Sequence, residues 1–339
     1  MLGPLLFLCF INDMPNALEF LSILFADDTS YLSCNTDTDK LVSDTNKELA
    51  KADDWFRANK LTLNVSKTKF MLFSPQGTFT TLNSIVRVGA EIIERIGSKC
   101  ETTFFKLVGV LLDDKLSWTH QIANVRKKLA SSNYALASLR RLLPLKIKLN
   151  VYNSLFRSHL DYGLVIWGGG THSSVRALEI MQKKALRNVA LRAYNAHCEP
   201  ILVKLNLLNL SDMIKLSLTK LIASYKLGRQ PASIEQLFDV FNYNNRTHKF
   251  TIDIQRYAYF KKQVPYTLIQ NWNMLYTADK NSICIIDKDL NSPLARLNAI
   301  KKSLTQQCIA QYKAKVVCNN VRCGDCNPNY GPHQVFGLT

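Results

Sequence analysis

Short apolar runs separated by tight polar breaks mark the beginning of the sequence. Residues 5–11 form an unbroken apolar run, a pattern typical of the middle of a buried element. Residues 20–33, FLSILFADDTSYLS, place an acidic pair between two apolar runs. This arrangement predicts two short strands joined by a tight turn at Asp27-Asp28, because aspartate is favoured in turns between strands.

A helix is expected over residues 38–59, with Thr38 or Asp39 as its cap. Apolar positions that approximate one face of this helix are Leu41, Leu49, Ala52, Trp55 and Phe56. The residues between them are mostly charged or polar, so the pattern is that of a helix that covers a core with one side.

Further strands are expected between this helix and residue 118. The alternating stretch TLNVSKTKFMLF predicts a strand that ends at Pro75. Residues 77–97 are expected to contain a strand pair, with 85–88 in one strand and 92–93 in the other. The stretch FFKLVGVLLDDKLSW predicts a hairpin that turns near Asp113-Asp114.

From Trp118 onward the apolar residues recur at helical spacing. Up to Pro144 these positions are Ile122, Val125, Leu129, Leu136, Leu139 and Leu143. Further helices are expected at 145–163, 173–194, 211–227 and 293–314. The sequence therefore predicts an α+β fold in three parts: a mixed part at 1–117, a helical part at 118–227, and a linker, last helix and Cys/His tail at 228–339.

The charge balance of the chain indicates what kind of partner it binds. Lys and Arg outnumber Asp and Glu by 43 to 26, which gives a net charge of +17. A surplus of this size favours a polyanionic partner, because each neutralised phosphate releases condensed counterions. A membrane surface is the competing partner, but no single basic amphipathic stretch dominates the chain. A plainly solvated surface is the third interpretation.

Nine cysteines, an odd number without regular spacing, argue against a secreted disulfide framework. We therefore expect an intracellular protein, with the choice between nucleus and cytoplasm left open. The opening MLGPLLFLCFIND lacks a basic region and a small-residue cleavage site, and no stretch is long and apolar enough to predict a membrane span.

Near the end of the chain, four metal-ligand residues follow one another as C-x4-C-x2-C-x6-H: Cys318, Cys323, Cys326 and His333. Three thiolates and one imidazole can make a tetrahedral zinc set. The spacing is not that of a standard zinc knuckle, so loosely placed thiols are the alternative.

The acidic pair at Asp27-Asp28 allows two interpretations. Two adjacent carboxylates between apolar strands repel one another, and a divalent cation such as Mg²⁺ removes that cost. Nucleotidyl transfer needs carboxylates of this kind, since paired ions stabilise both the attacking and the leaving oxygen. From the dipeptide alone, ordinary turn residues are the more frequent explanation.

The residues around the pair favour the first interpretation. Phe25-Ala26-Asp27-Asp28 resembles the aromatic-x-Asp-Asp box of reverse transcriptases, in the form common in non-LTR (LINE-like) retrotransposons, and the segment before it resembles the jockey and CR1 branch. Further blocks resemble that family in the same order: LGPLLF and INDMP at residues 2–15, Trp55 with NKL, LN and KTK up to residue 69, and FKLVGV at 105–110. The resemblance covers about residues 2–118. It implies part of a polymerase palm, an antiparallel sheet with a packing helix, followed by a thumb-like and a trailing region.

The resemblance also implies roles for residues near the box. Asp27 would be the principal ligand of Mg²⁺ or Mn²⁺, and Asp28 a weaker or indirect ligand. Phe25 would pack near the incoming nucleotide or the primer end. Template RNA, primer DNA and deoxynucleoside triphosphates would be the partners of the intact parent protein.

Residues farther along would contact the substrates. Lys67 or Lys69 could neutralise the leaving pyrophosphate, with a plainly exposed lysine as the alternative. Phe105 and Lys106 would lie near the primer strand, with simple sheet packing as the alternative. Trp55 matches a position of the family, although a tryptophan on a helix face more often belongs to the core.

One departure from the family is large. Its members carry another catalytic aspartate and the fingers before the LGPLLF block, so we expect a fragment with negligible polymerase activity on its own. Asp13, the pairs Asp53-Asp54 and Asp113-Asp114 offer no convincing replacement. A non-enzymatic nucleic-acid-binding remnant is the alternative function, and a basic helical interaction protein is a third.

Overall fold

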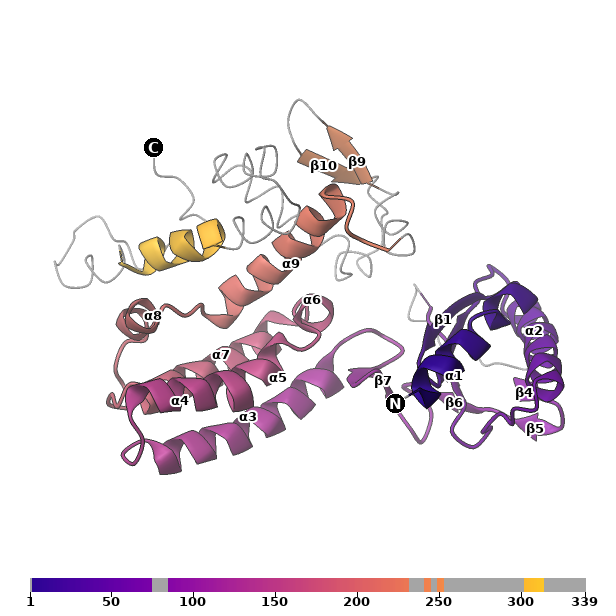
Figure 1. Cartoon of the computed structure of the whole chain (residues 1–339), viewed down its shortest axis with the longest axis horizontal. Helices are drawn as coiled ribbons and strands as arrows, with labels where there is room; N and C mark the ends of the chain where they lie inside the picture. Colours follow the sequence, from indigo (N-terminus) through magenta and orange to yellow (C-terminus); the bar gives the residue numbers. More distant parts are fainter. Residues whose placement is uncertain (1, 75–84, 232–240, 245–248, 253–301, 314–339) are drawn as a thin grey trace. The chain divides into compact units, whose positions relative to one another are not determined.

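A computed structural model describes residues 2–74, 85–231, 241–244, 249–252 and 302–313, which are the coloured parts of Figure 1. The chain divides into two compact units. Unit 1 comprises Met1–Leu107 and Leu112–Leu116, and unit 2 comprises Val108–Leu111 and Ser117–Thr339. Helices together with small sheets make this an α+β protein, which confirms the predicted fold class.

Unit 1 is built from short strands around one long helix. Its elements are α1 (Gly3–Ile11), η1 (Met14–Ala17), β1 (Leu21–Phe25), β2 (Asp28–Leu32), α2 (Thr38–Ala58), β3 (Lys69–Met71), β4 (Arg87–Val88), β5 (Glu91–Ile92), β6 (Glu94–Ile96) and β7 (Phe105–Leu107). The pairs β1–β2 and β4–β5 are antiparallel, whereas β3 and β6 pair in parallel. The strand that was predicted to end at Pro75 is shorter than expected, because only the three residues of β3 are extended and paired.

The core of unit 1 lies between α2 and the strands. One cluster of buried side chains is Ile11, Met14, Leu18, Ala52 and Phe56, and a second is Val42, Leu49, Val86, Val88 and Ile93. Phe20 and Tyr31 pack against both clusters, so the inner face of the β1–β2 hairpin joins them. The predicted helix is thus confirmed. The predicted cap, Thr38 or Asp39, is wrong: the cap is Asp37, whose carboxylate accepts hydrogen bonds from the backbone N–H groups of Asp39 and Lys40.

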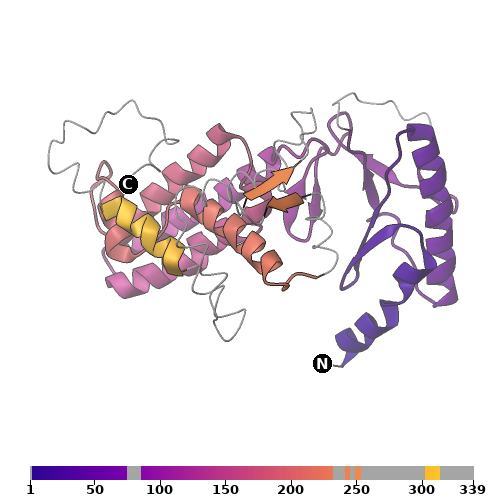
Figure 2. The same ribbon diagram turned by 90° about the horizontal axis from the view of Figure 1, so that it is seen from above.

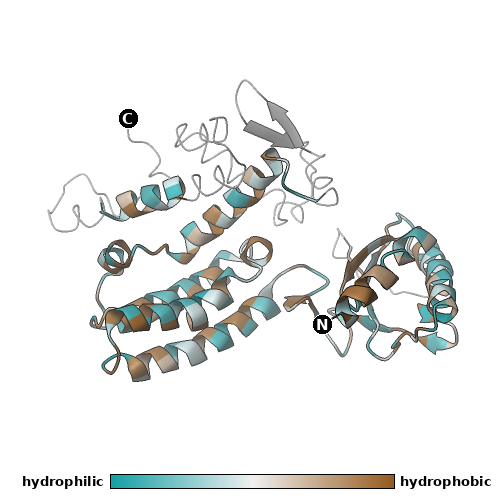
Figure 3. Cartoon of the chain, viewed as in Figure 1, coloured by the Kyte–Doolittle hydropathy of each residue, from teal (hydrophilic) through white to brown (hydrophobic). Residues whose placement is uncertain are grey.

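The first apolar run was expected to be buried, and that expectation is wrong. The run folds into α1, which is mostly hydrophobic along its length in Figure 3. Only Ile11 is buried, whereas Leu5 and Leu6 are 58% and 57% exposed. A helix that is apolar on all sides can bury only the face that meets a neighbouring element. Here that face carries Phe7 and Ile11, which pack against the first core cluster.

The hairpin of β7 and β8 (Val110–Leu112) turns at Val108-Gly109 and not at Asp113-Asp114 as predicted. Gly109 has φ +82°, a conformation that glycine adopts without strain. The two aspartates follow β8 and are buried. Asp114 accepts hydrogen bonds from the backbone N–H and the hydroxyl of Ser98. Buried carboxylates with such partners stabilise the turn that follows β8, in which the Leu116 N–H donates to the Asp113 carbonyl at 3.0 Å.

Unit 2 is mainly helical. Its elements are α3 (Thr119–Leu139), α4 (Leu145–Val151), η2 (Tyr152–Arg157), α5 (Ser158–Asp161), α6 (Leu164–Trp167), α7 (His172–Val189), α8 (Glu199–Leu205), α9 (Leu210–Lys226), the antiparallel pair β9 (Phe241–Asn244) and β10 (Lys249–Ile252), and a helical segment at 302–313. The predicted helix at 145–163 is one helical run that contains a π-helical segment, η2.

The core of unit 2 lies between α3, α7 and the run from α4 to α5. Fully buried residues there include Leu129, Leu136, Phe156, Leu178 and Leu186.

The helical segment 302–313 packs beside α9, as Figure 2 shows from above. The Tyr312 hydroxyl donates a hydrogen bond to Asp212 and accepts one from the backbone N–H of Asn209. Burial, and then the nearby charge of Asp212, raise the pKa of Tyr312.

Candidate divalent-metal site

The acidic pair lies at the tip of the β1–β2 hairpin. Phe25 and Asp28 are the last paired residues, so Ala26 and Asp27 alone form the loop. Ala26 has φ +54°, the positive value that two-residue hairpin turns require at their first central position. A Cβ atom in this conformation costs roughly 1–2 kcal/mol. The predicted hairpin is confirmed, with its turn one residue earlier than expected and Asp28 as the first residue of β2.

All residues of the tip, from Phe25 to Asp28, are exposed. Because side chains alternate along a strand, Leu21, Ile23 and Phe25 share the outer face of β1, and they are 59%, 54% and 60% exposed. Asp28 is the register partner of Phe25 on the neighbouring strand. Both carboxylates are thus open to a cation and its ligands, and an apolar strand face adjoins them.

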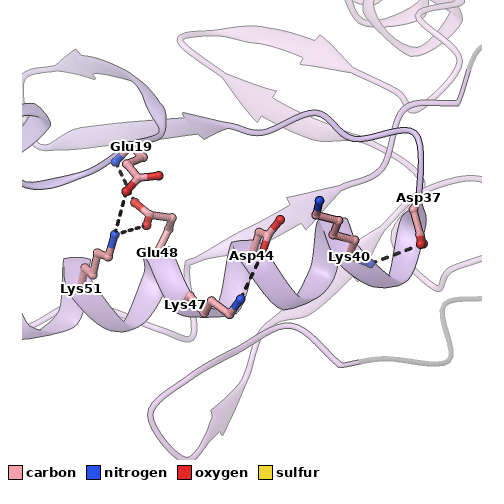
Figure 4. Close-up of polar contacts among 7 residues, drawn as sticks. All are labelled: Glu19, Asp37, Lys40, Asp44, Lys47, Glu48 and Lys51. Carbon is pink, nitrogen blue, oxygen red and sulfur yellow. Dashed lines mark hydrogen bonds and ion pairs between the residues drawn. The ribbon is translucent and has the colours of Figure 1, made fainter.

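Away from the tip, Glu48 on α2 holds the residue that precedes β1, as Figure 4 shows. One carboxylate oxygen accepts a hydrogen bond of 2.7 Å from the backbone N–H of Glu19, just before β1. The other oxygen forms an ion pair with the ammonium of Lys51. The same ammonium also forms an ion pair of 3.3 Å with the Glu19 carboxylate. Burial pushes the pKa of Glu48 upward, but the hydrogen bonds from Lys51 and Glu19 and the charge of Lys51 hold it below its usual value.

Sequence reasoning missed this role of Glu48. The residue lies on the helix that was predicted, and Glu48 and Lys51 have the i, i+3 spacing of a helical ion pair. That spacing is the signal that could have identified the pair. The contact to Glu19 is separated by 29 residues in sequence, and nothing in the pattern indicates it.

The two lysines near β3 differ in their surroundings. Lys67 is exposed in the turn before β3. Lys69 lies on β3, and its ammonium forms an ion pair with Glu94 on the adjacent strand β6. Among the interactions of the described residues, none joins either lysine to the hairpin tip. Their role at leaving pyrophosphate stays a prediction.

The remaining predicted contacts lie on other elements of unit 1. Phe105 is half-buried and Lys106 exposed on β7. Trp55 is half-buried on α2, where its ring lies 6.5 Å from that of Phe10 and 5.5 Å from that of Phe56. These ring contacts favour the core role of Trp55. The proximity of Phe105 and Lys106 to a primer stays a prediction.

The described residues contain no group of three or more His, Cys, Asp or Glu side chains that could hold a metal ion. Asp53 forms an ion pair of 2.7 Å with Arg57, and Asp13 is exposed beside η1. Asp27 and Asp28 are hard oxygen donors that fit Mg²⁺, but they supply only part of a coordination shell. The predicted zinc ligands Cys318, Cys323, Cys326 and His333 lie outside the described residues.

Two curated proteins of Drosophila melanogaster are similar to this chain. The RNA-directed DNA polymerase from mobile element jockey is 26% identical over 201 residues, which cover 56% of this chain and 21% of that protein. The probable RNA-directed DNA polymerase from transposon X-element is 28% identical over 197 residues, which cover 55% and 20%. The match thus spans about a fifth of the length of these relatives.

No family model matches the chain, and no solved structure matches it. Both relatives that it resembles are named as RNA-directed DNA polymerases of mobile elements. More narrowly, the chain is related to the reverse transcriptases of non-LTR, LINE-like elements, as the order of its motifs implied. In the described part of the chain, no helix has the length and apolar character needed to cross a membrane.

Proposed function

We propose that this chain supplies one part of the catalytic centre of an RNA-directed DNA polymerase, with Asp27 as the principal ligand of Mg²⁺ or Mn²⁺ and Asp28 as the weaker ligand. One observation carries the proposal: an adjacent acidic pair occupies the exposed tip of a two-residue hairpin in a chain related to such polymerases. Carboxylate oxygens are the ligands that these ions prefer.

The bound cations would stabilise the attacking 3′-oxygen of a primer and the leaving pyrophosphate of a deoxynucleoside triphosphate. The chain's own residues hold the ligands in position. The two-residue turn fixes the backbone of Asp27 and Asp28, and the Glu48 contact fixes the strand that leads to them. Phe25, on the outer face beside Asp28, offers a flat surface to a primer end or an incoming nucleotide.

We further assign a palm-like role to residues 1–117, a thumb-like role to 118–227 and a trailing role to 228–339. The β1–β2 hairpin packed on α2 supports the first assignment, and the helical content of unit 2 supports the second. RNA template and DNA primer are the proposed partners.

The 339-residue chain alone is expected to lack polymerase activity. Two adjacent carboxylates without a third ligand cannot hold a pair of ions in fixed geometry, and the described residues contain no larger set. Primer extension on an RNA template with the purified chain should give no product above background. Processive DNA synthesis by the chain would contradict this proposal.

A chimaera tests the metal role in a complete enzyme. The segment of the jockey polymerase that matches this chain is replaced by the chain's own segment, and primer extension is measured with Mg²⁺. Asp27→Asn is expected to lower the rate at least a hundredfold, because it removes a ligand charge from the metal site. The matched control is Asp54→Asn, an exposed aspartate on α2, which should leave the rate unchanged. Equal rates for the two variants would contradict the role of Asp27.

Nucleic-acid binding without catalysis is a second candidate function. The observation that favours it is the net charge of +17 together with the placement of that charge. Between Asp114 and Asp161 the sequence contains nine Lys and Arg residues and no Asp or Glu. Positive charge of this kind favours binding to phosphate backbones and needs no metal site.

A further inference from the structure

The positive charge of unit 2 is concentrated on a few elements. The acid-free stretch 115–160 contains α3, α4 and η2, and residues 180–198 at the end of α7 and beyond it are also free of Asp and Glu. The second stretch carries Lys183, Lys184, Arg187 and Arg192. Because α3 and α4 both pack against α7, the two stretches come together in the fold.

They meet where α3 and α7 end and α4 begins. The basic residues gathered there, which we call the basic cluster, are Arg140, Arg141, Lys146, Lys148, Arg187 and Arg192. The Lys148 ammonium donates a hydrogen bond of 3.0 Å to the carbonyl of Arg140, and the Arg140 guanidinium donates one of 3.4 Å to the carbonyl of Arg192. Backbone carbonyls therefore hold the centre of the cluster in place.

Acidic side chains do not neutralise this cluster. Within the ranges that the structure describes, none of its six members forms an ion pair with Asp or Glu. The Nε atom of Arg140 is buried and has no hydrogen-bond partner among the described residues. Like charges gathered without counter-charges destabilise a fold, and a bound anion removes that cost.

Lys148 shows most clearly the cost of placing a positive charge here without a negative partner. It is only 2% exposed, although lysine is almost never fully buried without a partner of opposite charge. Burial lowers the pKa of Lys148, and the charge of Arg140 lowers it further. A purely structural role as a cation at the end of α3 explains the hydrogen bond to Arg140. It does not explain why the exposed cations Arg141, Lys146 and Arg192 lie beside the same ends of α3, α4 and α7.

We propose that the basic cluster at the joint end of α3, α4 and α7 is a binding site for the phosphodiester backbone of a nucleic acid. The inference rests on the nucleic-acid-binding function proposed above and does not need the metal site. The exposed cations Arg141, Lys146 and Arg192 would contact successive phosphates, and buried Lys148, through its hydrogen bond to the Arg140 carbonyl, holds the backbone beside them. Tyr194, which is 88% exposed just beyond Arg192, adds a ring on which a base can stack.

An anionic membrane surface is the competing partner, because exposed Leu142 and Ile147 lie next to the basic residues in the chain. Two observations favour nucleic acid. The charges come from three elements and not from one amphipathic helix, since α4 has seven residues. The central pair is also fixed by backbone carbonyls, which suits a phosphate of defined position better than a fluid layer of headgroups.

The test measures binding of the full chain to a fluorescent RNA–DNA hybrid by anisotropy over a range of salt concentrations. The variant Arg141→Gln/Lys146→Gln/Arg192→Gln removes three exposed cations of the cluster. The matched control Arg176→Gln/Lys204→Gln/Arg229→Gln removes three exposed cations elsewhere in unit 2 and has the same net charge. All six positions are exposed, so both variants should keep the thermal unfolding midpoint of the original chain.

The cluster variant is expected to lose affinity at least about tenfold near physiological salt. The slope of log affinity against log salt should fall by roughly two to three units. The control should keep most of its affinity and most of its salt slope. Equal losses in the two variants, or no loss in either, would overturn the proposed site while leaving nucleic-acid binding intact. Failure of the original chain to bind hybrid at low salt, or binding only to phosphatidylserine vesicles, would overturn both the site and the second candidate function.

Discussion

Glu48 shows how a single residue connects two distant segments of unit 1. Its carboxylate accepts hydrogen bonds from a backbone amide before β1 and from a lysine one turn farther along α2. Its side chain is 11% exposed, whereas that of Lys51 is 48% exposed. The hydrogen bond to the amide is therefore shielded, and solvent weakens the ion pair. The residue positions the strand that leads to Asp27 and Asp28 without contacting either of them.

Glu48→Gln is expected to lower the free energy of unfolding by about 1 kcal/mol at pH 7, since a partly buried charged acceptor is lost. The folded-state pKa of Glu48 lies below its usual value, so its contribution is fully present above the pKa of unfolded glutamate, about 4.3. It disappears as the pH falls through the lowered pKa. Urea unfolding at pH 7 and at about pH 3 measures the difference between the two proteins, which should shrink in acid.

Asp44→Asn is the control for this substitution. Asp44 forms an ion pair with Lys47 on the same helix, but the two side chains are 42% and 71% exposed. Such a pair contributes at most a few tenths of a kcal/mol. A stability loss for Glu48→Gln that is independent of pH would contradict the role given to its charge.

Elements defined by local patterns were predictable from the sequence, whereas non-local pairings were not. The β1–β2 hairpin and α2 each have an apolar pattern with a turn or cap signal within a few residues, and α3 has a regular apolar period. The parallel pairing of β3 with β6 joins segments about 25 residues apart, and no periodicity indicates it. The turn of β7 and β8 was placed wrongly because Asp113-Asp114 is a stronger turn signal than Val108-Gly109.

For the candidate site too, the local motif was predictable from the sequence and the contacts between distant residues were not. The motif located Asp27 and Asp28, and the structure places them on an exposed tip. The Glu48 contact and the basic cluster depend on residues that are far apart in sequence. Short helices were also missed: α6 and α8 have four and seven residues, too few to show a helical period.

Gln182 connects three helical elements of unit 2. It is 1% exposed on α7, and its amide donates hydrogen bonds to the Tyr152 hydroxyl at 3.2 Å and to the Leu208 carbonyl at 3.0 Å. Its own oxygen accepts a hydrogen bond of 2.8 Å from the backbone N–H of Leu210, at the start of α9. The side chain thereby satisfies polar groups of η2 and of the α8–α9 connection.

Gln182→Leu is expected to lower the free energy of unfolding by about 3 kcal/mol, because it leaves two backbone groups buried without partners. Urea unfolding followed by circular dichroism, which reports mainly on the helices, measures the loss. The neighbouring substitution Lys184→Leu, at an exposed position of α7, should change stability by less than about 0.5 kcal/mol. Similar losses for the two variants would contradict the assigned role of the Gln182 amide.

At the scale of the whole molecule, the chain separates two kinds of chemistry between its two units. Unit 1 presents the acidic pair on a hairpin, and unit 2 carries the acid-free basic stretches. The first suits a cation and the second a phosphate backbone, and a polymerase needs both. The match to its relatives spans about a fifth of their length.

The most direct test of this account is paramagnetic broadening of backbone amide signals by Mn²⁺ in the purified chain. A site with two carboxylates should bind weakly, with a dissociation constant on the order of millimolar. We expect selective broadening of the signals from Phe25 to Thr29, its loss in Asp27→Asn/Asp28→Asn, and its retention in Asp54→Asn. Broadening spread evenly over exposed carboxylates, or unchanged in the double variant, would contradict the claim that the hairpin tip binds a divalent cation.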